Sequence, residues 1–261
     1  MKLPLYQVDA FTRRLFGGNP AAVVLLENWL PDEILAAIAA ENNLAETAFV
    51  IIQPDVIALR WFTPAVEVDL CGHATLAAAQ VIFRHYLPAA DSLSFSTRSG
   101  NLVVTRAADR LSMDFPARPG TPVEITDTLV AALGIRPREV YRARDLLAIL
   151  DSEAEVQSLQ PDMQRIAALD AFAVIVSARG AAVDFVSRFF APRAGIPEDP
   201  VTGSAHCTLV PYWAARLGKA ELSARQLSAR GGELHCRLAG DRVLIAGHAV
   251  EYLRGEIDVA V

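Results

Sequence analysis

The sequence predicts an α+β protein built from two similar halves. Its 261 residues exceed the usual size of a single domain, which is roughly 100–150 residues. Strand-like and helix-like apolar runs follow one another in a similar order twice along the chain. A Pro/Gly-rich stretch at 116–122 separates the two series. We therefore place one half at 1–117 and the other at 118–261.

The elements follow from the spacing of apolar residues, since short alternating or continuous runs predict strands and longer runs with a helical period predict helices. In the first half, strands are predicted near 3–9, 21–26, 47–52, 56–62, 92–97, 101–106 and 110–115, with helices at 31–42 and from 72 or 73 to about 86. In the second half, strands are predicted near 139–143, 145–150, 171–177, 182–190, 222–229, 233–238 and 242–246, with helical segments near 126–133, 160–168 and 203–217. Gly218 suits the end of the last helix.

Three sets of residues recur in the same order in both halves, as an internal duplication predicts. The matched segments are RWFTP at 60–64 with RFFAP at 188–192, offset by 128; GHA at 72–74 with GSA at 203–205, offset by 131; and RxGxL at 98–102 plus DRL at 109–111 with RxGxL at 230–234 plus DRV at 241–243, both offset by 132. Turn residues also recur by chance. Three ordered motifs, each at a junction between predicted elements, favour duplication.

Composition and charge exclude several classes of protein. The net charge is −6 and the isoelectric point is near 5.4, whereas a nucleic-acid-binding chain needs a clustered basic face. No apolar stretch approaches the ~20 residues that span a bilayer, and Asp9 interrupts any signal-peptide core. We therefore expect a cytoplasmic protein without nucleic-acid or membrane partners, whose apolar composition leaves room for a homodimer. The only lysines, Lys2 and Lys219, argue against pyridoxal phosphate chemistry.

Each half sends a strand into a short loop and then into an apolar helix that begins at Gly72 or Gly203. A helix start leaves up to four backbone N–H groups unpaired and carries about half a positive charge, and glycine lets an anion approach the backbone. Two such starts could bind a carboxylate or a developing enolate. The alternative is that they are ordinary capped helix starts, which the duplicated placement makes less attractive.

Polar residues gather around these helix starts. They are His73 in the first half and Asp199, Thr202, Ser204 and His206 in the second. Taken singly, His73 also fits a buried structural histidine, Asp199 a turn before proline, and Ser204 a helix cap.

Glu46 is the most unusual residue, because it lies between a predicted helix and the apolar strand that follows it. If this strand directs Glu46 into a cleft, partial desolvation would raise its pKa towards the range of a general base. We therefore regard Glu46 as the candidate base.

Six ordered blocks together resemble the PhzF-like phenazine-biosynthesis isomerase family. The blocks are DAF at 9–11, GGNPAAV at 17–23, NLAETAF at 43–49, RWFTP at 60–64, CGHAT at 71–75 and EDPVTGSA at 198–205. They cover both halves, so the resemblance is far more specific than any single motif.

The resemblance implies a diaminopimelate-epimerase-like fold, in which each half is a curved antiparallel sheet wrapped around a central helix and the substrate lies between the halves. It also suggests that the last strand, about 249–261, crosses back to the first half. The catalytic positions of the family fall on Glu46, His73, Asp199 and Ser204, and we assign Asn19, Gly72 and Gly203 to substrate binding.

The implied reaction is a cofactor-independent proton shift between carbons of a small carboxylic acid. Glu46 would remove or relay the proton, while His73 and Asp199 would hold and protonate the opposite side. Ser204 and the helix-start N–H groups would stabilise negative charge. Nothing in the sequence calls for a metal, nucleotide or flavin. The substrate itself, and whether it belongs to phenazine biosynthesis, cannot be read from the sequence.

Other functions stay open at this point. A two-cysteine racemase is disfavoured because Cys71 precedes the first helix start while Thr202 precedes the second, and Cys207 lies about one turn further on. Cys71 is then a small buried residue or has a role in a one-base racemase or epimerase of an amino or hydroxy acid. A non-catalytic carboxylate-binding protein is a further alternative, against which the intact Glu46 argues.

A metal hydrolase is a weaker alternative. It would use His73, Asp199 and His206, but no helical pair of metal ligands is present in the sequence.

Overall fold

The computed structural model describes residues 1–259 and forms two compact units. Unit 1 comprises Met1–Asp114 together with the segment that starts at Ala246, and unit 2 comprises Phe115–Ile245. The units thus join at Asp114 and Phe115, a few residues before the boundary that we placed between 117 and 118. The positions differ because composition marks turns, whereas backbone pairing decides to which unit a strand belongs.

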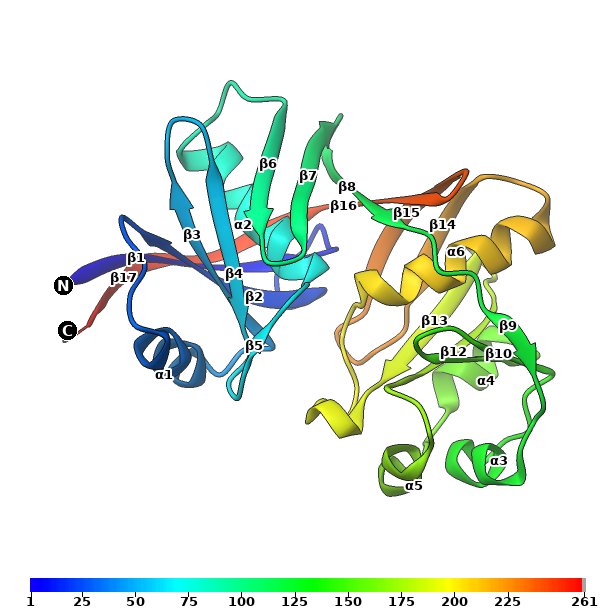
Figure 1. Cartoon of the computed structure of the whole chain (residues 1–261). Coiled ribbons are helices and arrows are strands. Elements are labelled where there is room, and N and C mark those ends of the chain that lie inside the picture. Colours follow the sequence, from blue (N-terminus) through cyan, green and yellow to red (C-terminus); the bar gives the residue numbers. More distant parts are fainter. Residues whose placement is uncertain (260–261) are drawn as a thin grey trace. The chain divides into compact units, whose positions relative to one another are not determined.

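Unit 1 is a mixed sheet (Figure 1). Its strands are β1 (Lys2–Ala10), β2 (Asn19–Leu26), β3 (Glu46–Ile52), β4 (Ile57–Phe62), β5 (Glu67–Val68), β6 (Ser92–Thr97), β7 (Gly100–Ala107), β8 (Arg110–Pro116) and β17 (Ala249–Asp258). Paired strands follow the order β17-β1-β2-β3-β4-β6-β7-β8, and the short β5 pairs with β4. The pairs β2–β3 and β4–β6 are parallel, and the others in this series are antiparallel.

Helices provide the crossovers that parallel pairs require. In unit 1, α1 (Asp32–Asn42) connects β2 to β3, and α2 (Gly72–His85) lies between β5 and β6 in the chain. Residues of α2 are buried along most of its length, including three successive alanines at 77–79, and the helix packs on β1, β2 and β3. The small alanine side chains allow the helix to lie close to the strands.

Unit 2 repeats this arrangement. Its strands are β9 (Thr121–Val123), β10 (Glu139–Arg142), β11 (Leu146–Ile149), β12 (Val174–Arg179), β13 (Phe185–Phe190), β14 (Glu221–Gln226), β15 (Gly232–Ala239) and β16 (Arg242–Gly247), the last of which ends across the boundary at 245. The order β9-β10-β11-β12-β13-β14-β15 again contains two parallel pairs, β11–β12 and β13–β14. The same alternation of pair types in both units supports the internal duplication.

The helices of unit 2 also follow the repeat. They are α3 (Asp127–Leu133), α4 (Glu153–Ser158), α5 (Met163–Ala168), the 3₁₀ turn η1 (Pro192–Ala194) and α6 (Gly203–Leu217). The long helix α6 connects the parallel strands β13 and β14, as α2 connects β4 and β6. The family resemblance implied antiparallel sheets, and this detail was wrong. The sheets are mixed because the helices that cover them are crossover connections.

Unit 1 receives its edge strand β17 from the end of the second half, and the edge strand of unit 2 is β9, which lies just after the junction at 114 and 115. β9 follows β8 in the chain and pairs with β10, while β17 follows β16 and pairs with β1 over nearly its whole length. Figure 1 shows β1 and β17 side by side near the two termini. Residues 260 and 261, which the predicted last strand included, lie outside the described residues.

Four short elements were absent from the sequence prediction: β5, β9, α4 and η1. Of these, α4 carries a readable signal, the S-x-x-E pattern of Ser152 and Glu155. Ser152 Oγ accepts a hydrogen bond from Glu155 N, and Glu155 Oε2 accepts one from the N–H of Asp151, the residue before the N-cap. β9 was masked by the Pro/Gly composition of its segment, and Pro122 is tolerated at the sheet edge. Among the described residues, no helix combines the length and apolar character needed to cross a bilayer.

Candidate active site

A buried acid–base pair lies at the start of α2. Glu46 is the first residue of β3 and His73 is the second residue of α2. His73 Nε2 and Glu46 Oε2 are 3.0 Å apart, and the two side chains are 6% and 12% exposed. The two atoms are not aligned as a hydrogen bond, and neither has another hydrogen-bond partner among the described residues. The first half therefore holds a proton donor and a proton acceptor in contact.

The second ring nitrogen of His73, Nδ1, contacts Asn19 and Cys71. Asn19, the first residue of β2, places Nδ2 3.2 Å from His73 Nδ1, and Cys71 Sγ lies 3.5 Å from the same nitrogen. When the Asn19 amide donates, Nδ1 accepts, and the ring proton is on Nε2, facing Glu46. Turning the amide by 180° presents its oxygen instead, which suits an imidazolium. Asn19 can thus support both protonation states of His73.

The charges around His73 favour its protonated form. Burial by itself would lower the pKa of His73, but Cys71 and Glu46 oppose burial and raise this pKa well above its ordinary value. For Cys71, burial and then the charge of Glu46 raise the pKa of the thiol. The raised pKa of Cys71 keeps it a neutral thiol at pH 7, a poor nucleophile and base. The Glu46 carboxylate is then the negative charge that favours the imidazolium form of His73.

The same three side chains form the group that could hold a metal ion among the described residues. The ligand atoms of Glu46, Cys71 and His73 lie within 4.8 Å of one another, and a set of oxygen, sulfur and nitrogen donors suits zinc. A metal would have to displace the protons of Cys71 and His73. The arrangement therefore fits an acid–base pair more directly than a metal centre.

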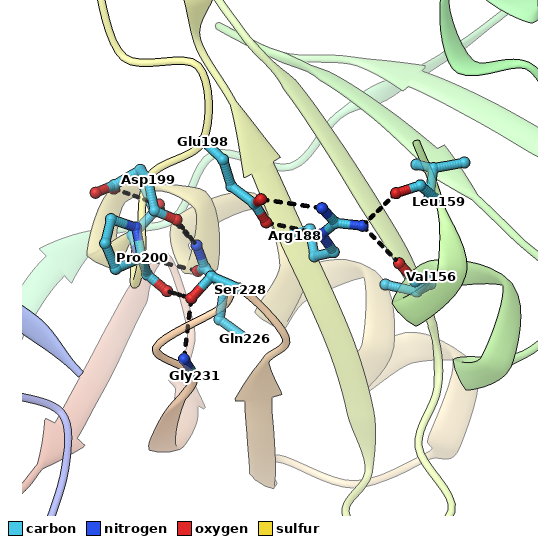
Figure 2. Close-up of polar contacts among 10 residues, drawn as sticks. Val156, Leu159, Arg188, Glu198, Asp199, Pro200, Gln226, Ser228 and Gly231 are labelled. Atoms are coloured by element: carbon cyan, nitrogen blue, oxygen red, sulfur yellow. Dashed lines mark hydrogen bonds and ion pairs between the residues drawn. The ribbon is translucent and has the colours of Figure 1, made fainter. Parts of the chain in front are cut away.

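The second group of predicted residues lies at the start of α6. Thr202 Oγ1 donates to Asp199 Oδ2 at 2.5 Å. Gln226 Nε2 donates to the Asp199 carbonyl at 2.8 Å, and Gln226 Oε1 accepts from Thr202 N at 2.9 Å. Figure 2 shows the Asp199 segment held further by Ser228, which donates to the Pro200 carbonyl. The last residue of β14 and the turn after it thus fix the loop that carries Asp199.

An ion pair anchors the same loop from the other side. Arg188 contacts Glu198 with two hydrogen bonds of 2.7 and 2.9 Å and donates to the carbonyls of Val156 and Leu159 (Figure 2). Glu198 directly precedes Asp199, so Arg188 ties this loop to the end of α4.

Unit 1 contains the matching ion pair, in which Arg60 binds Glu67 with two hydrogen bonds of 2.7 and 2.8 Å. We recognised the two arginines as a repeat in the sequence but missed their glutamate partners. The signal was present, because Glu67 and Glu198 differ by the same 131 residues as Gly72 and Gly203.

Ser204, the second residue of α6, contacts an arginine that the sequence reasoning did not single out. Arg144 Nη2 donates to Ser204 Oγ at 3.3 Å. Arg144 also binds the carboxylate of Asp145 through Nε and Nη2, both at 3.1 Å. Asp145 is buried, so it fixes the guanidinium beside the helix start.

His206 belongs to the interior of unit 2 and not to a metal site. Its Nδ1 donates to the Thr202 carbonyl at 2.8 Å, and its ring packs near Phe185. Burial lowers the pKa of His206 to about 4. The residue is thus a neutral core histidine, which removes one ligand of the metal-hydrolase alternative.

The two central helices begin without a side-chain cap. Cys71 and Thr202 occupy the N-cap positions of α2 and α6, and neither side chain accepts a hydrogen bond from its helix. By contrast, Thr126, Ser152 and Asp162 cap the short helices α3, α4 and α5. The N–H groups that follow Gly72 and Gly203 are therefore not occupied by their own N-cap residues.

Comparisons with known proteins show the family to which the chain belongs. The family model described as phenazine biosynthesis-like protein matches residues 8–255. The chain belongs to this family. A protein of Pseudomonas aeruginosa named as an uncharacterized isomerase is 55% identical, with 98% of this chain and 99% of that protein covered. A crystal structure of a PhzF-family protein from Enterococcus faecalis matches with a TM-score of 0.97 and 48% identity, covering 99% of this chain and all of that chain.

More distant structures share the fold of the family. A probable proline racemase from Agrobacterium radiobacter, with bound carbonate, matches at 13% identity and a TM-score of 0.63, covering 99% of this chain and 93% of that chain. The α+β fold with two similar halves, of the epimerase-like type, is thereby confirmed.

The structure brings the predicted residues together in two groups. Glu46, His73, Asn19 and Gly72 lie around the start of α2, and Asp199, Gly203 and Ser204 lie around the start of α6. Their catalytic and binding roles, and a common substrate for both groups, stay predictions.

Proposed function

We propose that this protein is a cofactor-independent isomerase that moves a proton between carbons of a small carboxylic acid, with Glu46 and His73 as its acid–base pair. The observation that carries the proposal is the buried contact between Glu46 Oε2 and His73 Nε2 at 3.0 Å. Relatives named as isomerases and the fold shared with a probable racemase support a reaction of this class.

The chemistry follows from what each group can do. The Glu46 carboxylate accepts a proton from a carbon of the substrate, and the electrons of the broken C–H bond spread into the substrate carboxyl group as an enolate. The backbone N–H groups at the start of α2 stabilise this charge. They are available because the side chain of the N-cap residue Cys71 accepts no hydrogen bond from them. An acid then returns a proton to another carbon. His73 and Asp199 are our candidates for this acid.

Burial of the pair suits proton transfer. Because both side chains are largely shielded from water, the local electrostatic interactions are strong and a proton is not readily lost to solvent. The raised pKa of His73 keeps its proton available at neutral pH. Asn19, in contact with Nδ1, can orient the ring in either charge state.

Exchange of hydrogen with solvent tests the proposal. Small unsaturated and ring-bearing carboxylic acids are incubated with the enzyme in D₂O, and deuterium incorporation at carbon is followed by NMR. We expect exchange with at least one acid class, a loss of roughly 10²–10⁴-fold in Glu46→Gln, and no loss in Glu41→Gln, which changes an exposed carboxylate on α1. Exchange that persists unchanged in Glu46→Gln would refute the proposal.

Two further results separate the remaining alternatives. Exchange that continues after dialysis against a chelator excludes a metal-dependent reaction. A product in which the double bond has moved indicates an isomerase, whereas inversion at a single carbon indicates a one-base racemase or epimerase. Binding of the acid without any exchange indicates a carboxylate-binding protein.

A further inference from the structure

The starts of α2 and α6 differ in the side chain that contacts the second residue of the helix. In unit 1 the neutral amide of Asn19 contacts His73, whereas in unit 2 the guanidinium of Arg144 contacts Ser204. Both partners come from the segment at or just before a matching strand, β2 or β11. The two helix starts therefore have partners of different chemistry, a neutral amide in unit 1 and a cation in unit 2.

The place of the base in unit 1 is taken by an apolar residue in unit 2. Thr47 pairs with Phe62 on β4, and Val174 pairs with Phe190 on β13, where Phe62 and Phe190 are matched residues of the repeat. The position before Thr47 is Glu46, and the position before Val174 is Ala173. Ala173 is buried and cannot move a proton. Unit 2 thus lacks the counterpart of the acid–base pair.

We propose that Arg144 is a specificity-determining residue that binds a carboxylate of the substrate together with Ser204. This inference rests on the proposed function and assigns recognition of the anion to unit 2. The side chain of Arg144 is 41% exposed, so a ligand can reach it. Asp145 holds one edge of the guanidinium, and Phe172 lies 4.7 Å from its central carbon. The group is therefore oriented before a ligand arrives.

Unused hydrogen-bond donors point to an acceptor-rich ligand. Arg144 uses Nε and Nη2 towards Asp145 and Ser204, and Nη1 has no hydrogen bond to the described residues. Ser204 Oγ accepts from Arg144, so its own hydrogen remains available as a donor. Thr202 does not cap the N–H groups of α6 with its side chain. A carboxylate can accept from a guanidinium and a hydroxyl at once, and it is the anion that the proposed substrate carries.

The nearby carboxylates are already engaged. Asp145 is paired with Arg144, and Asp199 Oδ2 accepts from Thr202. Their hydrogen bonds direct both carboxylates towards protein donors. Arg144 is preferred over lysine in this role because a planar guanidinium can bind Asp145 along one edge and still present Nη1 to a ligand.

Binding of malonate and of its diamide, malonamide, tests the inference without requiring the natural substrate. Affinities are measured by calorimetry, and the backbone amides of 203–205 are followed by NMR. We expect the wild-type protein to prefer malonate by about tenfold or more, with shifts at these amides, and Arg144→Gln to lose this preference. Arg142→Gln is the matched control, since Arg142 is 45% exposed and contacts Asp170 instead of Ser204.

A second variant, Arg144→Lys, controls for loss of folding in Arg144→Gln. Arg144→Gln leaves the buried Asp145 without its cation, so its melting temperature is measured alongside. Arg144→Lys keeps a positive charge next to Asp145 but loses the planar fork, and we expect it to weaken malonate binding by severalfold. Equal affinity for malonate and malonamide in the wild type, or unchanged malonate affinity in folded Arg144→Gln and Arg144→Lys, would overturn the inference.

The design separates this inference from the proposed function. Glu46→Gln should retain malonate binding, because binding needs no proton transfer. Arg144-dependent binding without hydrogen exchange in any acid would leave the anion site standing and refute the isomerase. Exchange that depends on Glu46, with malonate binding unaffected by substitution of Arg144, would support the isomerase and refute the anion site.

Discussion

The two central helices begin in the same way but present different groups. At the start of α2, His73 faces Glu46 in a buried pair, whereas at the start of α6, Ser204 faces the half-exposed Arg144. Both helices lack a side-chain cap. The comparison indicates that duplication supplied two similar helix starts and that divergence left one of them with a buried carboxylate–imidazole contact and the other with a cation.

The largest effect should come from exchanging the proton-carrying residue of unit 1. We predict that His73→Asn lowers the turnover number for hydrogen exchange by roughly 10²–10⁴-fold, because it removes the donor that faces Glu46. Ser204→Ala should instead raise the Michaelis constant by about tenfold with a smaller change in turnover, because it removes a ligand contact. Steady-state kinetics of both variants measure the turnover number and the Michaelis constant separately. Equal effects on turnover would break the proposed division of roles.

The two matched ion pairs should differ in their contribution to stability. Arg188 has further bonds to the carbonyls of Val156 and Leu159, whereas the further partner of Arg60 is the exposed Asp32. We predict that Arg188→Met lowers the free energy of unfolding by about 3–5 kcal/mol, and that Arg60→Met lowers it by a smaller amount. Denaturant unfolding measures both. A larger loss in Arg60→Met would contradict this reading of the repeat.

The pKa values of the histidines at the two helix starts should be shifted in opposite directions, upward for His73 and downward for His206. Burial lowers the pKa of His206 to about 4, while Cys71 and Glu46, against the effect of burial, raise that of His73. Between about pH 6.5 and 4, the unfolded chain binds a proton at His206 that the folded chain does not, so this residue makes the protein less stable as the pH falls. Its contribution is at most about 3 kcal/mol.

His73 contributes with the opposite sign. Its raised pKa stabilises the folded state at pH values below the unfolded pKa, and this stabilisation is lost as the pH rises through the folded pKa. NMR titration of the ring nitrogens should find His73 protonated above pH 6.5 and His206 neutral down to about pH 4. In His206→Gln, the loss of stability between those pH values should become shallower. An ordinary pKa for both rings would remove the electrostatic contrast between the two units.

The smallest effect is expected at the unmatched cysteine. Burial and the charge of Glu46 raise the pKa of Cys71, and the corresponding residue in unit 2 is Thr202. Cys71→Ala should therefore retain hydrogen exchange to within a fewfold and lose about 1 kcal/mol of stability from the small cavity. Complete loss of exchange in this variant, with folding intact, would point to a thiol in the reaction and against our assignment.

Much of the fold was readable from the chain because apolar periodicity and turn residues act locally. The boundaries predicted for α1, β6 and α6 lie within a residue or two of those observed. Short elements such as β5 and β9 were missed, since two or three residues give no periodic signal and gain their stability from a neighbouring strand. The parallel pairs were also missed, because strand direction depends on where a crossover helix packs.

The candidate site, like the fold, was predicted from the sequence only in part. The repeat identified Gly72 and Gly203, the sequence context singled out Glu46 and His73, and the family resemblance then placed both at catalytic positions. Neither could show that Glu46 and His73 touch, because that contact depends on the start of β3 meeting the start of α2. Arg144 was missed for a related reason, since it lies outside every matched motif and reaches Ser204 only through folding.

The sequence by itself determined the two-part plan, the order of the main strands and helices, and the family, since all of these are carried by local patterns and ordered motifs. Only the tertiary structure decided which polar groups meet. It paired the imidazole of His73 with a carboxylate in one unit and the hydroxyl of Ser204 with a guanidinium in the other. The physical reason is that the protonation and reactivity of a side chain depend on neighbours within a few ångströms, and residues far apart in the chain supply those neighbours.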